Sequence, residues 1–142
     1  MAAGIYVHIP FCLRKCFYCD FFSRPVDNFE LRREYTRALI YEIAFCGEKY
    51  GKNLKADTIF FGGGTPSLME PKFIDSIIDA LKKNFSISKQ CELTMAVSYT
   101  HLTLRRLFRK DYAAFYRYRH QKIRLKRQKC LYFLSHISRI MP

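Results

Sequence analysis

The 142-residue chain contains no tryptophan, only six glycines and five prolines, and no long apolar segment. No run approaches the roughly 18–20 apolar residues of a membrane-spanning helix, so we expect no membrane span. The N-terminus lacks the basic and then apolar pattern of a secretory signal, and the six cysteines do not suggest a disulfide framework. Both features favour a cytoplasmic protein with free thiols.

Acidic residues are almost missing from one part of the chain. Residues 1–95 contain 13 Lys or Arg and 11 Asp or Glu, whereas residues 96–142 contain 12 basic residues and one acid, Asp111. The net charge of +13 therefore comes mainly from the C-terminal third. Because the basic residues are confined to this tail, the charge of the whole chain does not predict a nucleic-acid partner, and we do not expect one.

Residues 1–95 alternate between short apolar runs and amphipathic segments. Three of the runs predict strands: 4–9, 56–61 and 91–95. Helical spacing predicts one helix over 28–49 and a second from Pro71 onward. This order is typical of an α/β fold with about three parallel strands and crossover helices. We therefore expect one folded part, 1–95, and an atypical basic tail, 96–142.

The first predicted helix has recognisable end signals. Asp27 and Glu30 fit a capping pattern in which the acids also favour the positive end of the helix dipole. Gly47 and Gly51 are the expected stops. Cys46 falls on the apolar face of this helix, where we expect it to be a small buried hydrophobe.

Three of the cysteines stand close together directly after the first predicted strand: Cys12, Cys16 and Cys19, spaced C-x3-C-x2-C. Three thiolates in one loop can hold three irons of a cubane cluster and leave the fourth iron open to a small molecule. Zinc is the alternative, but a structural zinc needs four ligands. Only His8 or Cys46 could be the fourth, at spacings unlike the common zinc patterns. We expect His8 to be a structural histidine instead.

A run of three glycines, Gly62, Gly63 and Gly64, follows the second predicted strand and leads into Thr65 and Pro66. Without Cβ atoms the backbone can adopt positive φ and approach a neighbouring molecule closely. A glycine run alone is more often a simple turn. Its place between a strand and a helix, downstream of the cysteine loop, favours a cofactor cradle.

Two motifs carry a family resemblance. The stretch Tyr6-Val7-His8-Ile9-Pro10-Phe11-Cys12 through Cys19-Asp20-Phe21, followed by Phe60-Phe61-Gly62-Gly63-Gly64-Thr65-Pro66-Ser67, resembles the radical S-adenosylmethionine (SAM) superfamily. More narrowly, it is similar to the oxygen-independent coproporphyrinogen III oxidase-like proteins and their haem-chaperone branch. The resemblance covers roughly residues 4–95 and implies the N-terminal part of a partial (βα) barrel.

The resemblance also implies cofactors and their ligands. A [4Fe–4S] cluster would be held by Cys12, Cys16 and Cys19, and SAM by Tyr6, Tyr18, Gly63, Gly64 and Thr65. The implied partners are haem or a porphyrinogen, and an electron donor such as flavodoxin or ferredoxin. Oxidases of the family usually carry another cysteine just after the triad. Asp20-Phe21-Phe22 stands there instead, which is more similar to the haem chaperones and leaves open whether the protein is an enzyme.

The family pattern breaks at Ala96. Family members carry a glutamate directly after the segment that matches 92–95, where it helps to bind SAM, and the composition of this chain changes at the same point. Three interpretations of 96–142 stay open. The segment is a basic amphipathic helix that binds RNA or an anionic membrane, or a solvated extension. Alternatively, it is not the natural continuation, since a change of reading frame would produce both the lost acid and the charge jump.

Overall fold

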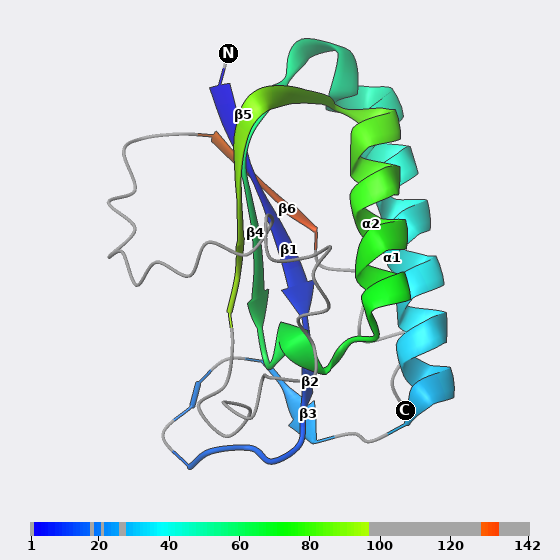
Figure 1. The fold of residues 1–142 in the computed structure, drawn as a ribbon, viewed down its shortest axis with the longest axis vertical. Helices are drawn as coiled ribbons and strands as arrows, with labels where there is room; N and C mark the ends of the chain where they lie inside the picture. The colour runs from blue at the N-terminus through cyan, green and yellow to red at the C-terminus, as the bar shows by residue number, and fades with distance from the viewer. Residues whose placement is uncertain (1, 18, 21, 26–27, 97–128, 134–142) are drawn as a thin grey trace.

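The computed structural model describes residues 2–17, 19–20, 22–25, 28–96 and 129–133. Its centre is a four-stranded sheet in the order β5-β4-β1-β6. The strands are β1 (Ala2–Ile9), β4 (Lys55–Gly63), β5 (Ser86–Met95) and β6 (Lys129–Phe133). Helices α1 (Phe29–Tyr50) and α2 (Pro71–Asn84) lie side by side on one face of the sheet (Figure 1). Four short elements complete the described part: β2 (Phe11–Cys12), β3 (Arg24–Pro25), and the 3-10 turns η1 (Gly51–Asn53) and η2 (Pro66–Leu68).

The strands of the sheet are parallel, and β1, β4 and β5 follow one another in chain order, whereas β6 lies on the other side of β1. β1 pairs with β4, and β4 pairs with β5, each time through a helix on the same face. Strands that advance in one direction, with all helices on one side, are the first units of a (βα) barrel. The predicted α/β fold with parallel strands and crossover helices is confirmed. Neither helix of the described part is long and apolar enough to cross a bilayer.

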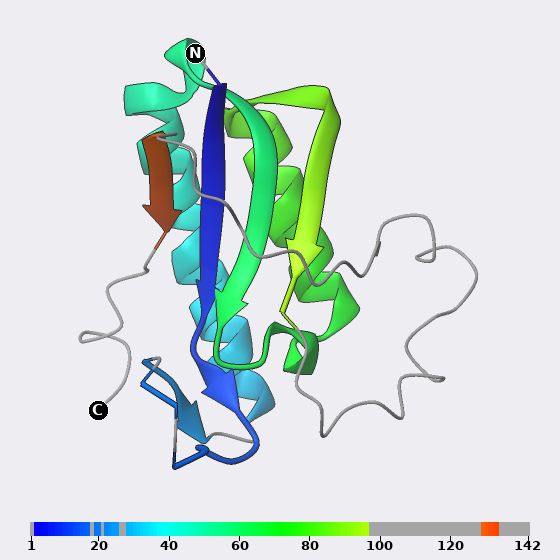
Figure 2. The same ribbon diagram turned by 90° about the vertical axis from the view of Figure 1, so that its left-hand side faces the viewer.

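The hydrophobic core lies between the sheet and the helices. Ile5, Val7 and Ile9 of β1 are at most 4 % exposed. They belong to one buried cluster with apolar residues of the helices, including Tyr35, Leu39, Ile43, Ile77 and Leu81. Because side chains alternate along a strand, Tyr6 and His8 point to the other face of the sheet. In Figure 2 that face is turned away from both helices.

The ends of α1 differ from the prediction in two details. Asn28, not Asp27, is the N-cap: its Oδ1 accepts a hydrogen bond of 3.1 Å from the Leu31 amide. Asp27 lies outside the described residues. Gly47 does not end the helix but lies inside it, where an added Cβ would be 2.5 Å from the Cβ of Asn84. It allows α1 and α2 to approach closely, and the predicted stop at Gly51 is the C-cap.

The strands are longer and more numerous than predicted. β4 runs on into Gly62 and Gly63, and β5 begins at Ser86 rather than at residue 91. β6 was not expected at all: it comes from the basic tail and pairs in parallel with β1, from Ala3–Lys129 to Val7–Phe133. Two parallel strands require a long connection, and nothing local in a short apolar run reveals its partner. The remainder of the tail, 97–128 and 134–142, lies outside the described residues.

Candidate cofactor site at the carboxyl end of the sheet

The cysteine loop leaves the sheet at the carboxyl end of β1 and returns to it. Cys12 is buried in β2, Cys16 is exposed and Cys19 is half-buried. The Cys19 amide donates to the Cys16 carbonyl at 3.1 Å, which makes a tight turn between them. The loop is closed by the Arg24 amide, which donates to the Pro10 carbonyl at 2.8 Å, and by the pairing of β3 with β2. One of the three thiols is thus fixed to the core, and two stand on the outer part of the loop.

The glycine segment meets this loop directly. β1 and β4 are parallel, and their last paired residues are Ile9 and Gly63. Beyond them the Gly64 amide donates to the Ile9 carbonyl, and the Thr65 amide donates to the Phe11 carbonyl, both at 2.7 Å. Thr65 Oγ1 donates to Cys12 Sγ at 3.6 Å. The two motifs, about fifty residues apart in the sequence, therefore form one site at the same end of the sheet.

The absence of side chains on the glycines is needed for this contact. Gly63 has a φ of +103°, and a Cβ there would be 2.7 Å from His8 Cε1. A Cβ on Gly64 would be 2.5 Å from the Phe11 carbonyl oxygen and 2.9 Å from Cys12 Sγ. We interpreted the glycines as a surface for a bound molecule. In the structure the glycines have a more direct role: because they have no side chains, the end of β4 can pack against the cysteine loop.

His8 connects the sheet to the returning arm of the loop. It is 5 % exposed, and its Nε2 donates to the Phe22 carbonyl at 2.9 Å. Since Nε2 carries the proton, Nδ1 accepts from the hydroxyl of Tyr6, 3.3 Å away. Burial lowers the pKa of His8, and the hydrogen bond to Phe22 opposes this in part. His8 is therefore neutral, with both ring nitrogens engaged, as expected of a structural histidine rather than a metal ligand.

Tyr6 lies beside His8 on the same face of the sheet. Its ring stacks on that of Phe60 in β4, with centroids 5.8 Å apart and an interplanar angle of 19°. Its partly buried ring is thus held near the glycine segment. Tyr18, the other aromatic residue assigned to SAM, lies outside the described residues.

The donor set suits a cubane cluster in kind and in spacing. Three thiols occur within eight residues, one of them fixed beside a backbone that has no side chains. The described residues contain no group of three His, Cys, Asp or Glu side chains already gathered closely enough to hold a metal ion.

Two further cysteines, Cys46 of α1 and Cys91 of β5, belong to a different class. Burial is the main cause that raises the pKa of both thiols, and nearby carboxylates raise it further. A raised pKa keeps a thiol protonated, and the thiol form is a poor metal ligand. Neither cysteine lies in the loop. Cys46 is half-buried rather than fully buried as predicted, although it packs against the core as a hydrophobe would. Its raised pKa weakens the zinc alternative that used Cys46 as a fourth ligand.

Several residues near the site were not singled out from the sequence. The Tyr35 hydroxyl donates to the His8 carbonyl at 2.6 Å, although its helical spacing marked it only as core. The buried hydroxyls of Ser23, at the end of the cysteine loop, and Ser67, after the glycine segment, have no hydrogen-bond partner among the described residues. Arg32 of α1 and Glu70, just before α2, form an ion pair. No local signal predicts these contacts, since each partner is distant in sequence.

Comparison with known proteins agrees with this geometry. The family model described as the radical SAM superfamily matches residues 6–119, a range that runs past the composition change at residue 96. An oxygen-independent coproporphyrinogen III oxidase of Bradyrhizobium diazoefficiens is 33 % identical over 102 residues, which is 72 % of this chain and 23 % of the relative. The haem chaperone HemW of Buchnera aphidicola (from Schizaphis graminum) is 36 % identical over 108 residues, 74 % of this chain and 28 % of the relative.

The fold has a counterpart among solved structures. Coproporphyrinogen III oxidase (HemN) from Escherichia coli, described as a radical SAM enzyme, superposes with a TM-score of 0.63 at 26 % identity. The match covers 67 % of this chain and 22 % of that protein. The chain thus spans about a quarter of the length of the relatives it matches.

Proposed function

Because the chain belongs to the radical SAM superfamily, within the group that contains coproporphyrinogen III oxidase and the haem chaperone HemW, we propose that it binds a [4Fe–4S] cluster and SAM. Cys12, Cys16 and Cys19 are the proposed cluster ligands. Gly63, Gly64 and Thr65, with Tyr6 and Tyr18, are the proposed contacts of SAM.

The observation that carries the proposal is the junction of the two loops. The backbone bonds from Gly64 to Ile9 and from Thr65 to Phe11 place the glycine segment against the first cysteine. A single small molecule can therefore touch a cluster on one loop and the backbone of the other. When bound, the cluster and SAM would supply radical chemistry once an electron donor reduces the cluster, as the superfamily implies.

The chain's own groups have distinct parts in this proposal. Cys12 provides a ligand whose position is set by the core, and the Thr65 hydroxyl, 3.6 Å from its sulfur, donates a hydrogen bond to it. Phe11 and the core beneath it keep water from one side of the loop, because Phe11 is fully buried. The partly buried ring of Tyr6 lies on the face of the sheet that also carries His8.

Within the family we propose the haem-chaperone branch. The support is the segment Asp20-Phe21-Phe22 after the triad, where the oxidases usually have a further cysteine. The partners would be haem or a porphyrin, together with a flavodoxin or ferredoxin as electron donor, in the cytoplasm. The discriminating assay mixes the protein with haem and, separately, with coproporphyrinogen III and a reductant. We expect haem binding without decarboxylation, and the formation of vinyl groups would assign the chain to the oxidases.

Cluster binding is tested by anaerobic reconstitution with iron and sulfide. We expect about four irons per chain and a broad absorption near roughly 400 nm. Serine at Cys12, Cys16 and Cys19 together should abolish both. The matched controls are Cys46→Ser and Cys91→Ser, which remove thiols outside the loop and should leave the iron content unchanged. Equal iron in the triple variant and the wild type would overturn the proposal.

A further inference from the structure

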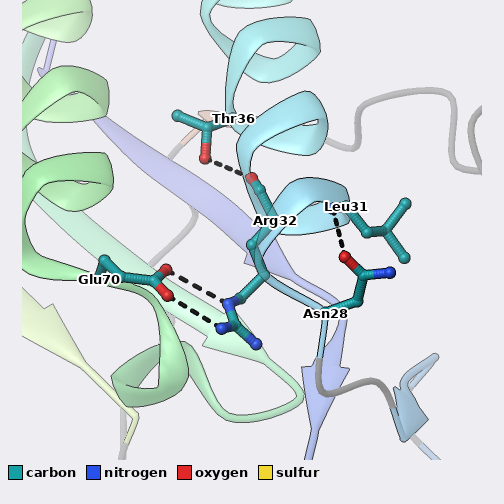
Figure 3. Close-up of polar contacts among 5 residues, drawn as sticks. All are labelled: Asn28, Leu31, Arg32, Thr36 and Glu70. Atoms are coloured by element: carbon teal, nitrogen blue, oxygen red, sulfur yellow. Dashed lines mark hydrogen bonds and ion pairs between the residues drawn. The ribbon is translucent and has the colours of Figure 1, made fainter.

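An ion pair joins the segments that follow the two loops. Arg32 lies in the first turn of α1, which begins shortly after the cysteine loop, and Glu70 lies between η2 and α2, shortly after the glycine segment. Nη2 of Arg32 is 2.9 Å from Oε1 of Glu70, and Nε is 3.3 Å from Oε2 (Figure 3). This two-point contact fixes both the distance and the orientation of the partners, as a single charge contact does not.

The pair is partly removed from solvent. The side chains are 12 % exposed for Arg32 and 27 % exposed for Glu70. Glu70 occupies the N-cap position of α2 but makes no side-chain cap bond, because its carboxylate is directed to Arg32. A screened surface pair contributes little, whereas a partly buried, two-point pair resists separation.

Neighbouring contacts hold the same two helix starts. The rings of Phe29 and Phe73, at the first turns of α1 and α2, have centroids 5.4 Å apart. Asn28 caps the first turn of α1, and Thr36 Oγ1 donates to the Arg32 carbonyl at 2.8 Å. The backbone that carries Arg32 is therefore fixed, so the ion pair connects two rigid helix ends.

From this arrangement we propose that Arg32 and Glu70 are positioning residues that hold the cysteine loop and the glycine segment in register. The loops already meet next to the strands, through the amides of Gly64 and Thr65. The ion pair joins the helix starts that follow the two loops, and so adds a contact on the helix side. The effect of the ion pair on SAM binding rests on the proposed function. Its effect on the relative position of the two loops does not.

The chain offers a matched control. Arg33, the next residue along α1, forms an ion pair with Glu30 of the same helix, and both side chains, 43 % and 56 % exposed, are more open to solvent than those of Arg32 and Glu70. Arg33→Ala removes the same side-chain type from the same turn without touching the second loop. An effect that comes only from lost charge or lost helix stability should appear in both variants.

The first test uses amide hydrogen exchange of the chain without cofactors, followed by NMR. In Arg32→Ala we expect the Gly64 and Thr65 amides to exchange about tenfold faster or more, while the amides of Ile59 and Phe61 in β4 keep their rates. Arg33→Ala should leave all four unchanged. The charge-swapped chain with Arg32→Glu and Glu70→Arg should recover part of the protection. Arg32→Lys, which keeps the charge but not the two-point contact, serves if the alanine variant does not fold.

Two results would overturn the inference. If the exchange rates of the Gly64 and Thr65 amides do not change, the ion pair does not hold the loops. If the exchange rates rise equally along the whole of β4, the pair adds only general stability. A second test uses the reconstituted protein: SAM affinity should fall by about tenfold in Arg32→Ala at constant iron per chain. If the wild-type chain takes up no cluster, the proposed function fails, and the exchange measurement still decides the role of the pair.

Discussion

Replacing Gly64 with alanine should separate the two loops, and the structure gives the size of the effect. The new Cβ would be 2.5 Å from the Phe11 carbonyl oxygen and 2.9 Å from Cys12 Sγ. The two backbones must move apart by roughly 1 Å to reach an ordinary van der Waals separation of about 3.5 Å. Both neighbours are held, Phe11 by complete burial and Cys12 by β2, so neither can rotate away as a flexible side chain would.

The cost has two parts. Forcing a methyl group into a packed site destabilises by about 1–3 kcal/mol. The movement also stretches the hydrogen bonds from Gly64 to Ile9 and from Thr65 to Phe11, each worth about 0.5–1.5 kcal/mol. We expect a loss of about 2–4 kcal/mol in the free energy of unfolding. For a chain of this size the melting temperature then falls by about 8–16 °C.

The assay is thermal unfolding followed by circular dichroism, with Gly62→Ala as the comparison. There the new Cβ would meet ring atoms of Phe60 at 2.6 Å and of Tyr6 at 2.8 Å, which are side-chain atoms and not backbone atoms. The expected loss is only about 1 kcal/mol. If Gly64→Ala melts within about 2 °C of the wild type, or no lower than Gly62→Ala, the close contact between the loops is refuted.

Three further predictions concern single side chains. Burial lowers the pKa of His8 below its ordinary 6.5. As the pH falls below about 6.5, the unfolded chain therefore binds a proton at His8 that the folded chain does not bind. The free energy of unfolding should be highest above about pH 6.5 and should decrease as the pH drops below it. Urea titrations at several pH values should show this decline in the wild type. The decline should be weaker in His8→Gln, whose side-chain amide can still donate to the Phe22 carbonyl. An equal decline in both proteins would exclude His8 as the cause. Tyr35→Phe removes the 2.6 Å bond to the His8 carbonyl and should cost about 1–2 kcal/mol by the same titration, and no loss would show that this bond does not stabilise the fold. Ala96 directly follows β5, and its amide donates to the Phe61 carbonyl at 2.9 Å. Ala96→Glu should tighten SAM binding by about tenfold or more in calorimetry, whereas Ala96→Gln should do so less.

The parts of the fold that depend on local pattern could be predicted from the sequence. The alternation of buried Ile5, Val7 and Ile9 and the apolar stripe of α2 each report one face of one element, and periodicity detects that directly. The meeting of the two loops followed from topology, because parallel strands bring their carboxyl ends to one edge. Boundaries were less accurate, as the early start of β5 shows.

Contacts between distant residues could not be predicted. Arg32 and Glu70 are 38 residues apart, and either could equally have faced solvent. Gly64 is needed because its backbone packs against the Phe11 carbonyl, which belongs to the cysteine loop. The glycine run by itself indicates only that the backbone is conformationally free. β6 is held by an edge of β1 that no pattern within 129–133 identifies. In each case the information lies in the partner and not in the segment itself.

The central claim is that one small molecule bridges a cluster on the cysteine loop and the backbone of the glycine segment. The most direct measurement is the EPR spectrum of the reconstituted, reduced chain with and without SAM. We predict the signal of a reduced [4Fe–4S] cluster whose g-values change when SAM is added, and a smaller change in Gly64→Ala at equal iron content. A spectrum that SAM leaves unchanged, in a chain that holds its full complement of iron, would contradict the account.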